Sequence, residues 1–121
     1  MKKILIVEDE KILREMYVEK LSREGFKVSF ADNAREGLNM VKKERPDLVV
    51  LDILLPEENG VYFLEKLRND TKTSKIKVVA FSNYDGADTK KEAKKWKIED
   101  YLIKTDYTPN QMVKKLKKYL G

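Results

Sequence analysis

The sequence predicts an α/β protein in which one parallel sheet is covered by helices on both faces. Short apolar runs alternate with longer segments whose apolar residues recur every three or four positions, which is the pattern of successive βα units. Two of the runs, residues 4–7 and 48–51, are apolar throughout, as expected for strands buried on both faces. Five such units in 121 residues leave room for one layered domain, which we expect to span residues 1–121.

The first two units follow from apolar spacing and helix-capping signals. After the strand at residues 4–7, apolar residues recur at helical spacing in a first helix, at Ile12, Leu13, Met16, Tyr17 and Leu21. Gly25 follows the last turn, where a left-handed cap is expected. Residues 26–30 alternate between apolar and polar side chains, so we place this strand toward the sheet edge. Asn33 with Glu36 three residues later predicts the start of the second helix.

The third and fourth units are bounded by proline and asparagine. Pro46 ends the second helix, and the strand at residues 48–51 follows it. A third helix begins after an irregular segment that includes Asn59. A fourth strand is predicted to end at Phe81, and a fourth helix to span about residues 87–96.

The fifth unit completes the sheet. Residues 101–103 form a short strand, and Thr108, Pro109 and Gln111 supply the cap, the first-turn proline and the capping-box partner of the last helix. The arrangement that fits five βα units best is a doubly wound five-stranded parallel sheet in the flavodoxin-like order 2-1-3-4-5, with helices on both faces.

Acidic side chains follow two of the buried strands at the point where each strand ends. Glu8 and Asp9 come directly after the first strand, and Asp52 comes directly after the third. Ligands of an open parallel sheet bind outside the carboxyl ends of its strands, so the three carboxylates converge if the two strands are neighbours. Carboxylates that close repel one another and need raised pKa values or a cation. A hard divalent ion such as Mg²⁺ suits such a cluster.

Two further polar side chains come at strand ends. Ser82 follows the fourth strand and Lys104 follows the fifth. Together with Asp9 and Asp52 they form a set suited to phosphoryl transfer, because each carboxylate can give Mg²⁺ an oxygen and Asp52 can attack phosphorus as a nucleophile. The Ser82 hydroxyl and the Lys104 ammonium can hold the oxygens of the moving phosphoryl group.

Composition narrows the chemistry further. The chain contains no His and no Cys, which excludes an imidazole base, a thiol nucleophile and a disulfide. No apolar run approaches the roughly 20 residues of a membrane span, so we expect a cytoplasmic protein that does not enter a membrane. The formal net charge is +5, and we interpret the lysines of residues 114–118 as the solvated face of the last helix rather than a nucleic-acid surface.

These residues resemble the receiver domains of two-component response regulators, and the resemblance covers the whole chain. The motifs that carry it are ILIVEDE at the first strand, DILLPEENG from Asp52 to Gly60, Ser82 after the fourth strand, and Tyr101 with Lys104 three residues later. The chemotaxis receiver is the single-domain example of this family. Because the sequence ends after the last helix, we expect no output domain.

The resemblance implies a phosphoacceptor that takes its phosphoryl group from the phosphohistidine of a sensor histidine kinase or a histidine phosphotransfer protein. Asp52 is implied to accept the group, and Ser82 and Lys104 to bind it. Tyr101, with Ser82, is implied to switch a surface made of the fourth helix, fifth strand and fifth helix, which signals to an unknown downstream protein. A homodimer that forms on phosphorylation stays open. The chain would assist its own phosphorylation and dephosphorylation without being an enzyme.

The resemblance also implies the ligands of the metal ion. Asp9 and Asp52 are implied to bind Mg²⁺ directly, and Glu8 to bind it through a water molecule. The backbone carbonyl of Leu54 is implied to complete the protein's share of the coordination.

Two other interpretations come from different functional classes. One is a receiver-like interaction module that keeps the fold and signals by binding, without phosphorylation of Asp52. The other is a small flavodoxin-like cofactor protein, which is disfavoured because no glycine-rich or hydroxyl-rich phosphate loop follows the first strand.

The sequence departs from the family pattern after Lys104 and at Lys97. Thr105 follows Lys104 where the family generally has a proline with a cis peptide bond. A cis bond before another residue costs about 2.5 to 4 kcal/mol, so we expect a trans bond and a reshaped loop. Lys97 stands where the family often has glycine, and a lysine in left-handed geometry would cost on the order of 1 kcal/mol, which favours a different end of the fourth helix.

Overall fold

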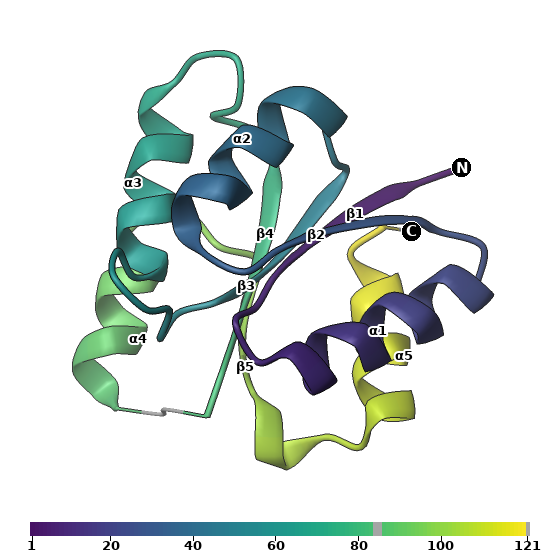
Figure 1. The fold of residues 1–121 in the computed structure, drawn as a ribbon. Coiled ribbons are helices and arrows are strands. Elements are labelled where there is room, and N and C mark those ends of the chain that lie inside the picture. Colours follow the sequence, from purple (N-terminus) through teal and green to yellow (C-terminus); the bar gives the residue numbers. More distant parts are fainter. Residues whose placement is uncertain (84–85, 121) are drawn as a thin grey trace.

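The computed structural model describes residues 1–83 and 86–120, which form one parallel sheet with helices on both faces (Figure 1). The strand order is β2-β1-β3-β4-β5, which confirms the predicted order. The elements along the chain are β1 (Lys3–Val7), α1 (Lys11–Arg23), β2 (Lys27–Ala31), α2 (Ala34–Glu44), β3 (Leu48–Asp52), α3 (Gly60–Asn69), β4 (Lys77–Ser82), α4 (Ala87–Lys94), β5 (Asp100–Ile103), a 3₁₀ turn (Lys104–Asp106) and α5 (Pro109–Lys118).

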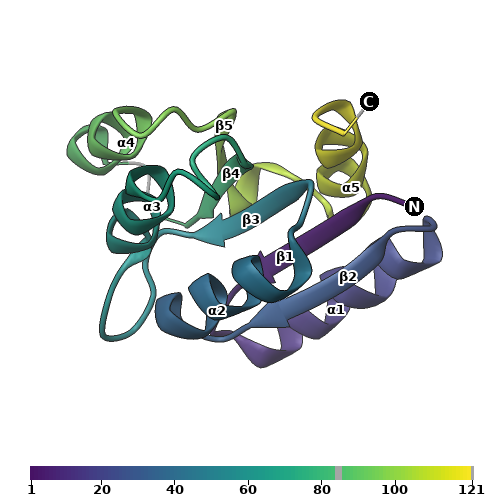
Figure 2. The ribbon, with the colours of Figure 1, turned by 90° about the horizontal axis from the view of Figure 1, so that it is seen from above.

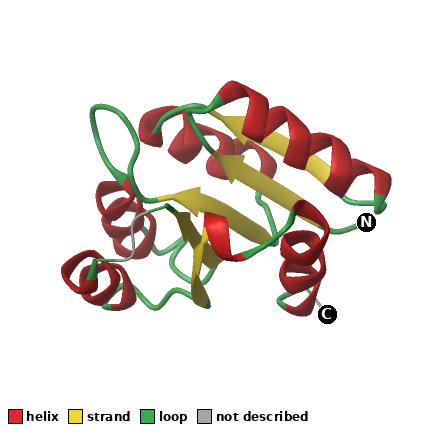
Figure 3. Cartoon of the chain, turned by 90° about the horizontal axis from the view of Figure 1, so that it is seen from below, coloured by secondary structure: helices red, strands yellow, loops and turns green. Residues whose placement is uncertain are grey.

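The two faces of the sheet carry separate hydrophobic cores. Helices α2, α3 and α4 cover one face, and α1 and α5 cover the other, so the strands lie between two groups of helices (Figures 2 and 3). The central strands β1 and β3 contribute to both cores, because their alternate side chains point to opposite faces. This explains why residues 4–7 and 48–51 are apolar throughout. The edge strand β2 is less buried, as its alternating sequence predicts.

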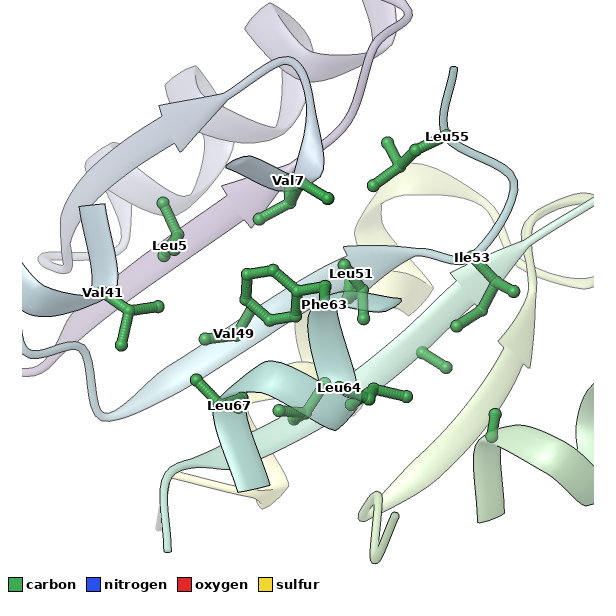
Figure 4. Packing of buried hydrophobic residues seen from close by; sticks show 14 of the residues in the cluster. Leu5, Val7, Val41, Val49, Leu51, Ile53, Leu55, Phe63, Leu64 and Leu67 are labelled. Atoms are coloured by element: carbon green, nitrogen blue, oxygen red, sulfur yellow. The ribbon is translucent and has the colours of Figure 1, made fainter. Parts of the chain in front are cut away.

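Two glycines let the helices of the α2–α3 face approach the sheet closely. A Cβ atom at Gly37 of α2 would lie 3.0 Å from both Phe63 and Val7, whose side chains meet at the centre of this core (Figure 4). A Cβ at Gly60 would lie 2.7 Å from the Cα atom of Ile53, and the Gly60 N–H donates to the Ile53 carbonyl at 2.8 Å. The start of α3 is therefore fixed directly against the end of β3, which carries Asp52.

The capping signals in the sequence mark real helix starts. The side chains of Asn33, Asn59 and Thr108 each accept a hydrogen bond from a backbone N–H in the first turn of α2, α3 and α5. Gly25 has a φ of 93°, as its predicted left-handed cap requires. No helix in the described part of the chain is both long and apolar enough to cross a membrane.

Ile12 and the end of the fourth helix differ from expectation. Ile12 is 81% exposed, because Leu13, Tyr17 and Leu21 are spaced by four residues and define the face of α1 that meets the sheet. Helix α4 ends at Lys94, short of the predicted residue 96. The expectation of a different helix end at Lys97 is wrong, because Lys97 has a left-handed φ of 57°. Its carbonyl accepts a hydrogen bond from Arg68 at 3.2 Å, which helps to hold that conformation.

The peptide bond between Lys104 and Thr105 is trans, as expected from the sequence. The chain reshapes into the 3₁₀ turn Lys104–Asp106 immediately after β5. This turn is the part of the loop that places Lys104 at the carboxyl edge of the sheet.

Candidate functional site

Three carboxylates converge at the carboxyl edge of the sheet. Strand β1 pairs with β3, with Val7 opposite Leu51, so the residues that follow on the two strands are neighbours. One carboxylate oxygen each from Glu8, Asp9 and Asp52 lies within 4.8 Å of the others. Glu8 and Asp52 are buried, whereas Asp9 is exposed. The predicted convergence of these acids is confirmed.

Lys104, which directly follows β5, extends its side chain into this acid cluster. Its Nζ atom lies 2.5 Å from Oε1 of Glu8 and 3.3 Å from Oδ2 of Asp52. The side chain of Lys104 is only 10% exposed, so little water screens these contacts. Its ammonium also lies 5.1 Å from the centre of the Phe81 ring. A single cation thus faces two buried carboxylates at once.

The carboxylate of Asp52 is held from both sides. Oδ1 accepts a hydrogen bond from the backbone N–H of Leu54 at 3.1 Å, and Oδ2 faces Lys104. Burial raises the pKa of Asp52 to about 7, since it removes the water that stabilises the charged form. Lys104 lowers this pKa and Glu8 raises it, but burial is the largest influence. Asp52 is therefore a carboxylate that changes its charge near neutral pH.

The ammonium of Lys104 stays charged in the same surroundings. Burial by itself lowers the pKa of Lys104. The hydrogen bond and negative charge of Glu8, together with Asp52, outweigh burial and raise the pKa above its usual value. Lys104 is accordingly the permanent positive charge of the site.

Arg14 supports the turn that carries Glu8 and Asp9, and sequence reasoning did not identify it. Nη1 of Arg14 donates to the backbone carbonyl of Glu8 at 3.0 Å, and the guanidinium lies 5.1 Å from the centre of the Phe30 ring. An arginine in the first turn of a helix carries no sequence signal for a contact to a carbonyl six residues earlier. Glu8 is also held by its own side chain, because Oε2 accepts a hydrogen bond from the Glu10 N–H at 3.1 Å.

Ser82 lies beside the acid cluster in the sheet. Asp52 pairs in register with Phe81, and Ser82 pairs with Ile103, so Ser82 comes to the same edge as Asp52 and Lys104. Ser82 is fully buried at the last position of β4. The predicted grouping of Ser82 with the acids and the lysine is therefore consistent with the strand register.

Tyr101 and Leu54 occupy different surroundings. Tyr101 is 8% exposed and belongs to the core beneath α2, α3 and α4, with the ammonium of Lys90 lying 5.7 Å from the centre of its ring. Leu54 contacts the site through its backbone N–H, although the residue as a whole is 53% exposed. The backbone of Leu54, which the resemblance implies as a metal ligand, contacts Asp52, and the role of Tyr101 as a switch stays a prediction.

The donor set of the cluster fits a hard divalent cation. Three carboxylates offer oxygen atoms within one small volume, and the chain has no His or Cys to offer imidazole or thiolate ligands. Binding a cation there would also offset the repulsion between buried Glu8 and Asp52. Receiver domains as a family bind Mg²⁺ at an acidic site of this kind.

Comparisons with known proteins point to one family. Residues 4–117 match the response regulator receiver domain family. The chain is 27% identical to the polar-differentiation response regulator DivK of Brucella anthropi over 99% of this chain and 97% of that protein. It is 30% identical to the phosphate regulon transcriptional regulatory protein PhoB of Pseudomonas aeruginosa over 98% of this chain, but it covers only 52% of that protein.

Solved structures show the same fold. A CheY-like receiver domain protein from Methanospirillum hungatei superposes with a TM-score of 0.90 at 28% identity, over 99% of this chain and 94% of that one. Several curated relatives are longer: the chain spans 34% of a probable transcriptional regulatory protein of Picosynechococcus and about half of the PhoB proteins that it matches.

Proposed function

The chain belongs to the response regulator receiver domain family of two-component signalling, and we propose that it accepts a phosphoryl group on Asp52 from a partner's phosphohistidine. The observation that supports this best is the setting of Asp52, whose carboxylate lies beside the Lys104 ammonium and close to two further carboxylates. We propose that the receiver unit spans residues 1–121.

The reaction that we propose forms one bond and breaks one. An oxygen of the Asp52 carboxylate attacks phosphorus, the bond between phosphorus and the histidine nitrogen breaks, and the leaving imidazole takes up a proton. The ionised carboxylate is a far better nucleophile than the protonated acid, so the pKa of about 7 makes deprotonation of Asp52 part of the reaction near neutral pH. The Leu54 N–H and Lys104 fix the orientation of the nucleophile.

Lys104 and Ser82 would bind the transferred group. The ammonium already lies 3.3 Å from Asp52, so it is placed to neutralise charge on the phosphoryl oxygens as the new bond forms. Ser82, at the adjacent strand end, would donate its hydroxyl to another of these oxygens. As it binds the phosphoryl group, the Lys104 ammonium can keep its hydrogen bond to Glu8, because it carries three N–H donors.

Mg²⁺ would be held by Asp9 and Asp52 directly, by the Leu54 carbonyl, and by Glu8 through water. When bound, the ion supplies positive charge that draws together the acceptor carboxylate and the phosphoryl oxygens. Oε1 of Glu8 contacts the Lys104 ammonium at 2.5 Å and Oε2 accepts the Glu10 N–H, so a water-mediated contact to the ion would share one of these oxygens.

The signal would leave through helix α4, strand β5 and helix α5. Ser82 ends β4 next to β5, and Tyr101 lies in β5 beneath α4, so a shift of Ser82 toward the phosphoryl group would free space for the Tyr101 ring. We propose a sensor histidine kinase or a histidine phosphotransfer protein as donor and a downstream protein as target. The alternative is an interaction module that is never phosphorylated, which the reshaped loop after Lys104 favours.

Incubation with Mg²⁺ and acetyl phosphate, followed by intact-protein mass spectrometry, tests the proposal. We expect the wild type to gain one phosphoryl group and Asp52→Asn to gain none. Asp47→Asn is a matched control, because Asp47 is an exposed carboxylate at the opposite end of β3, and it should gain one group. Equal phosphorylation of wild type and Asp52→Asn would move the acceptor elsewhere. A wild type that accepts nothing from acetyl phosphate or phosphoramidate would favour the interaction module.

A further inference from the structure

A groove separates the C-terminal halves of α2 and α3, at the end of the sheet where the strands begin. The two helices pack side by side (Figures 1 and 2). Hollows of about 340 and 240 Å³ lie in succession between them and the loop before β4. We call this the α2–α3 groove and define its floor as Leu38, Val41, Leu67, Thr73 and Ile76. Val41 and Leu67 lie at the end of the core farthest from Ile53 and Leu55 (Figure 4).

The floor of the groove offers apolar contact without free polar groups. Val41 and Leu67 are buried, and Leu38 and Ile76 are partly buried against the same core. The hydroxyl of Thr73 donates to the Leu67 carbonyl at 2.7 Å. Because Val41, Leu67 and Thr73 are already buried, a ligand in the groove would cover mainly the exposed apolar surface of Leu38 and Ile76. Its polar groups would have to find partners on the rim.

The rim of the groove is positively charged. Four exposed cations surround it: Lys42, Arg45, Lys66 and Lys72. None of them has a carboxylate within 4.0 Å among the residues that the structure describes. Asp70 is the acid that also lines the groove, and its Oδ1 atom accepts the backbone N–H of Lys72 at 2.9 Å. These cations do not stabilise the fold through ion pairs, and they concentrate positive charge beside an apolar floor.

We infer that the α2–α3 groove is a docking site for an acidic segment of a partner protein that also carries apolar side chains. Carboxylates of such a segment would meet the four rim cations, and its apolar side chains would cover the floor. Complementary charge steers this kind of encounter and fixes its register, while burial of the apolar side chains supplies affinity.

A nucleic acid fits the same surface less well. Proteins that bind single strands stack the bases on exposed aromatic rings, and the floor of the groove is aliphatic. Tyr62, the aromatic residue that lines it, already has the Lys66 ammonium 5.6 Å from the centre of its ring. Three of the four rim cations are lysines, which lack the planar fork with which arginine grips phosphates.

This docking site is separate from the phosphorylation proposed above. The groove lies at the amino ends of the strands, and Asp52 lies at the carboxyl end of β3. Binding in the groove should therefore be the same in the wild type and in Asp52→Asn. Loss of phosphorylation and loss of docking can be told apart with that one variant.

Fluorescence anisotropy with a labelled peptide tests the inference. The probe is a synthetic amphipathic helix with glutamate on one face and leucine on the other. We expect Lys42→Glu/Lys66→Glu to weaken binding by about tenfold or more, because two attractions become two repulsions. The matched control is Lys114→Glu/Lys118→Glu on α5, which changes the net charge equally at exposed positions, and it should weaken binding by less than about threefold.

Further measurements test whether the groove binds the acidic peptide, a nucleic acid, or any negatively charged molecule. Circular dichroism confirms that both double variants are folded, and amide chemical shifts on peptide addition should change at Leu38, Val41 and Ile76. Equal weakening in the two double variants would overturn the inference, because it would show attraction to net charge alone. So would shifts confined to other surfaces, or an oligothymidylate that binds the groove more tightly than the peptide at equal ionic strength.

Discussion

Two cations, Lys104 and Arg68, lie partly buried at opposite ends of the sheet, and their partners differ. Lys104, after β5, faces the carboxylates of Glu8 and Asp52. Arg68, in the last turn of α3, has no carboxylate within 4.0 Å in the described chain. Its guanidinium donates instead to four backbone carbonyls, those of Ile76 at 2.7 Å, Trp96 at 2.8 Å, Ser74 at 3.1 Å and Lys97 at 3.2 Å.

The difference separates a cation that can change partners from one that cannot. Carboxylates can be protonated, can bind a metal ion or can accept a phosphoryl group, and each event changes what Lys104 contacts. Backbone carbonyls have no such alternatives and need a donor at every pH. Burial lowers the pKa of Arg68, but an arginine stays charged throughout the range in which proteins fold. Arg68 therefore joins the loops before β4 and β5 permanently, whereas the contacts of Lys104 are conditional.

Removal of Arg68 should have the largest effect on stability. Arg68→Met keeps much of the aliphatic stem but deprives four carbonyls of their donor, and we expect a loss of about 3 kcal/mol in the free energy of unfolding. Urea denaturation measures this, and the loss should be the same at acid and alkaline pH. Arg23→Met, at an exposed arginine of α1, should change stability by less than about 0.5 kcal/mol. A similar small change in Arg68→Met would show that water replaces the guanidinium.

The contrast between these cations also shows what the sequence could and could not predict. Glu8, Asp52 and Lys104 were predictable, because each stands at the carboxyl end of an apolar strand and parallel strands bring these ends to one edge. The role of Arg68 was not predictable, since its partners are backbone atoms of two distant loops, and backbone carbonyls are present at every position.

Two further residues show the same limit of local patterns. Lys97 adopts left-handed geometry against its intrinsic preference, in the turn after α4 where its carbonyl accepts a hydrogen bond from Arg68. Ile12 matches a helical pattern but lies on the exposed side of α1. Spacing alone does not say which of two adjacent apolar residues faces the sheet.

The stability of the protein should depend on pH, because Asp52, one of the two partners of Lys104, gains or loses a proton near neutral pH. The pKa of Asp52 is about 7 in the folded protein, above its ordinary value of 3.8, so the folded state binds the proton more tightly than the unfolded state. The stabilisation that this tighter proton binding gives the folded state is fully present below the pKa of Asp52 in the unfolded chain. It is lost as the pH rises through about 7. Relative to Asp52→Asn, the wild type should lose about 2 kcal/mol between about pH 5 and about pH 8. Parallel stability curves for the two proteins would contradict the raised pKa.

Replacement of Lys104 should have a smaller effect that depends on its neighbour. Lys104→Met leaves Glu8 and Asp52 without a counter-charge, and we expect a loss of about 1.5 kcal/mol at about pH 8. In the Asp52→Asn background the loss should fall by about 1 kcal/mol, because one repulsion is gone. Arg68→Met should lose the same stability in both backgrounds. A double-mutant cycle by urea denaturation measures both couplings. If the effects of Lys104→Met and Asp52→Asn on the free energy of unfolding simply add, the two residues do not interact, and the contrast between Lys104 and Arg68 fails.

The smallest expected effect is at Lys97, whose left-handed conformation the Arg68 contact helps to hold. Lys97→Gly should raise the free energy of unfolding by about 0.5 to 1 kcal/mol, because glycine adopts a φ of 57° without the steric cost of a Cβ atom. The matched control is Lys95→Gly two residues earlier, where φ is −59°, and there the same substitution should cost about 0.5 to 1 kcal/mol. If Arg68 holds Lys97 in place, the gain at Lys97 should shrink in the Arg68→Met background, since the lysine can then relax to an unstrained conformation. An undiminished gain in that background would mean that the turn after α4 keeps its left-handed residue without the guanidinium.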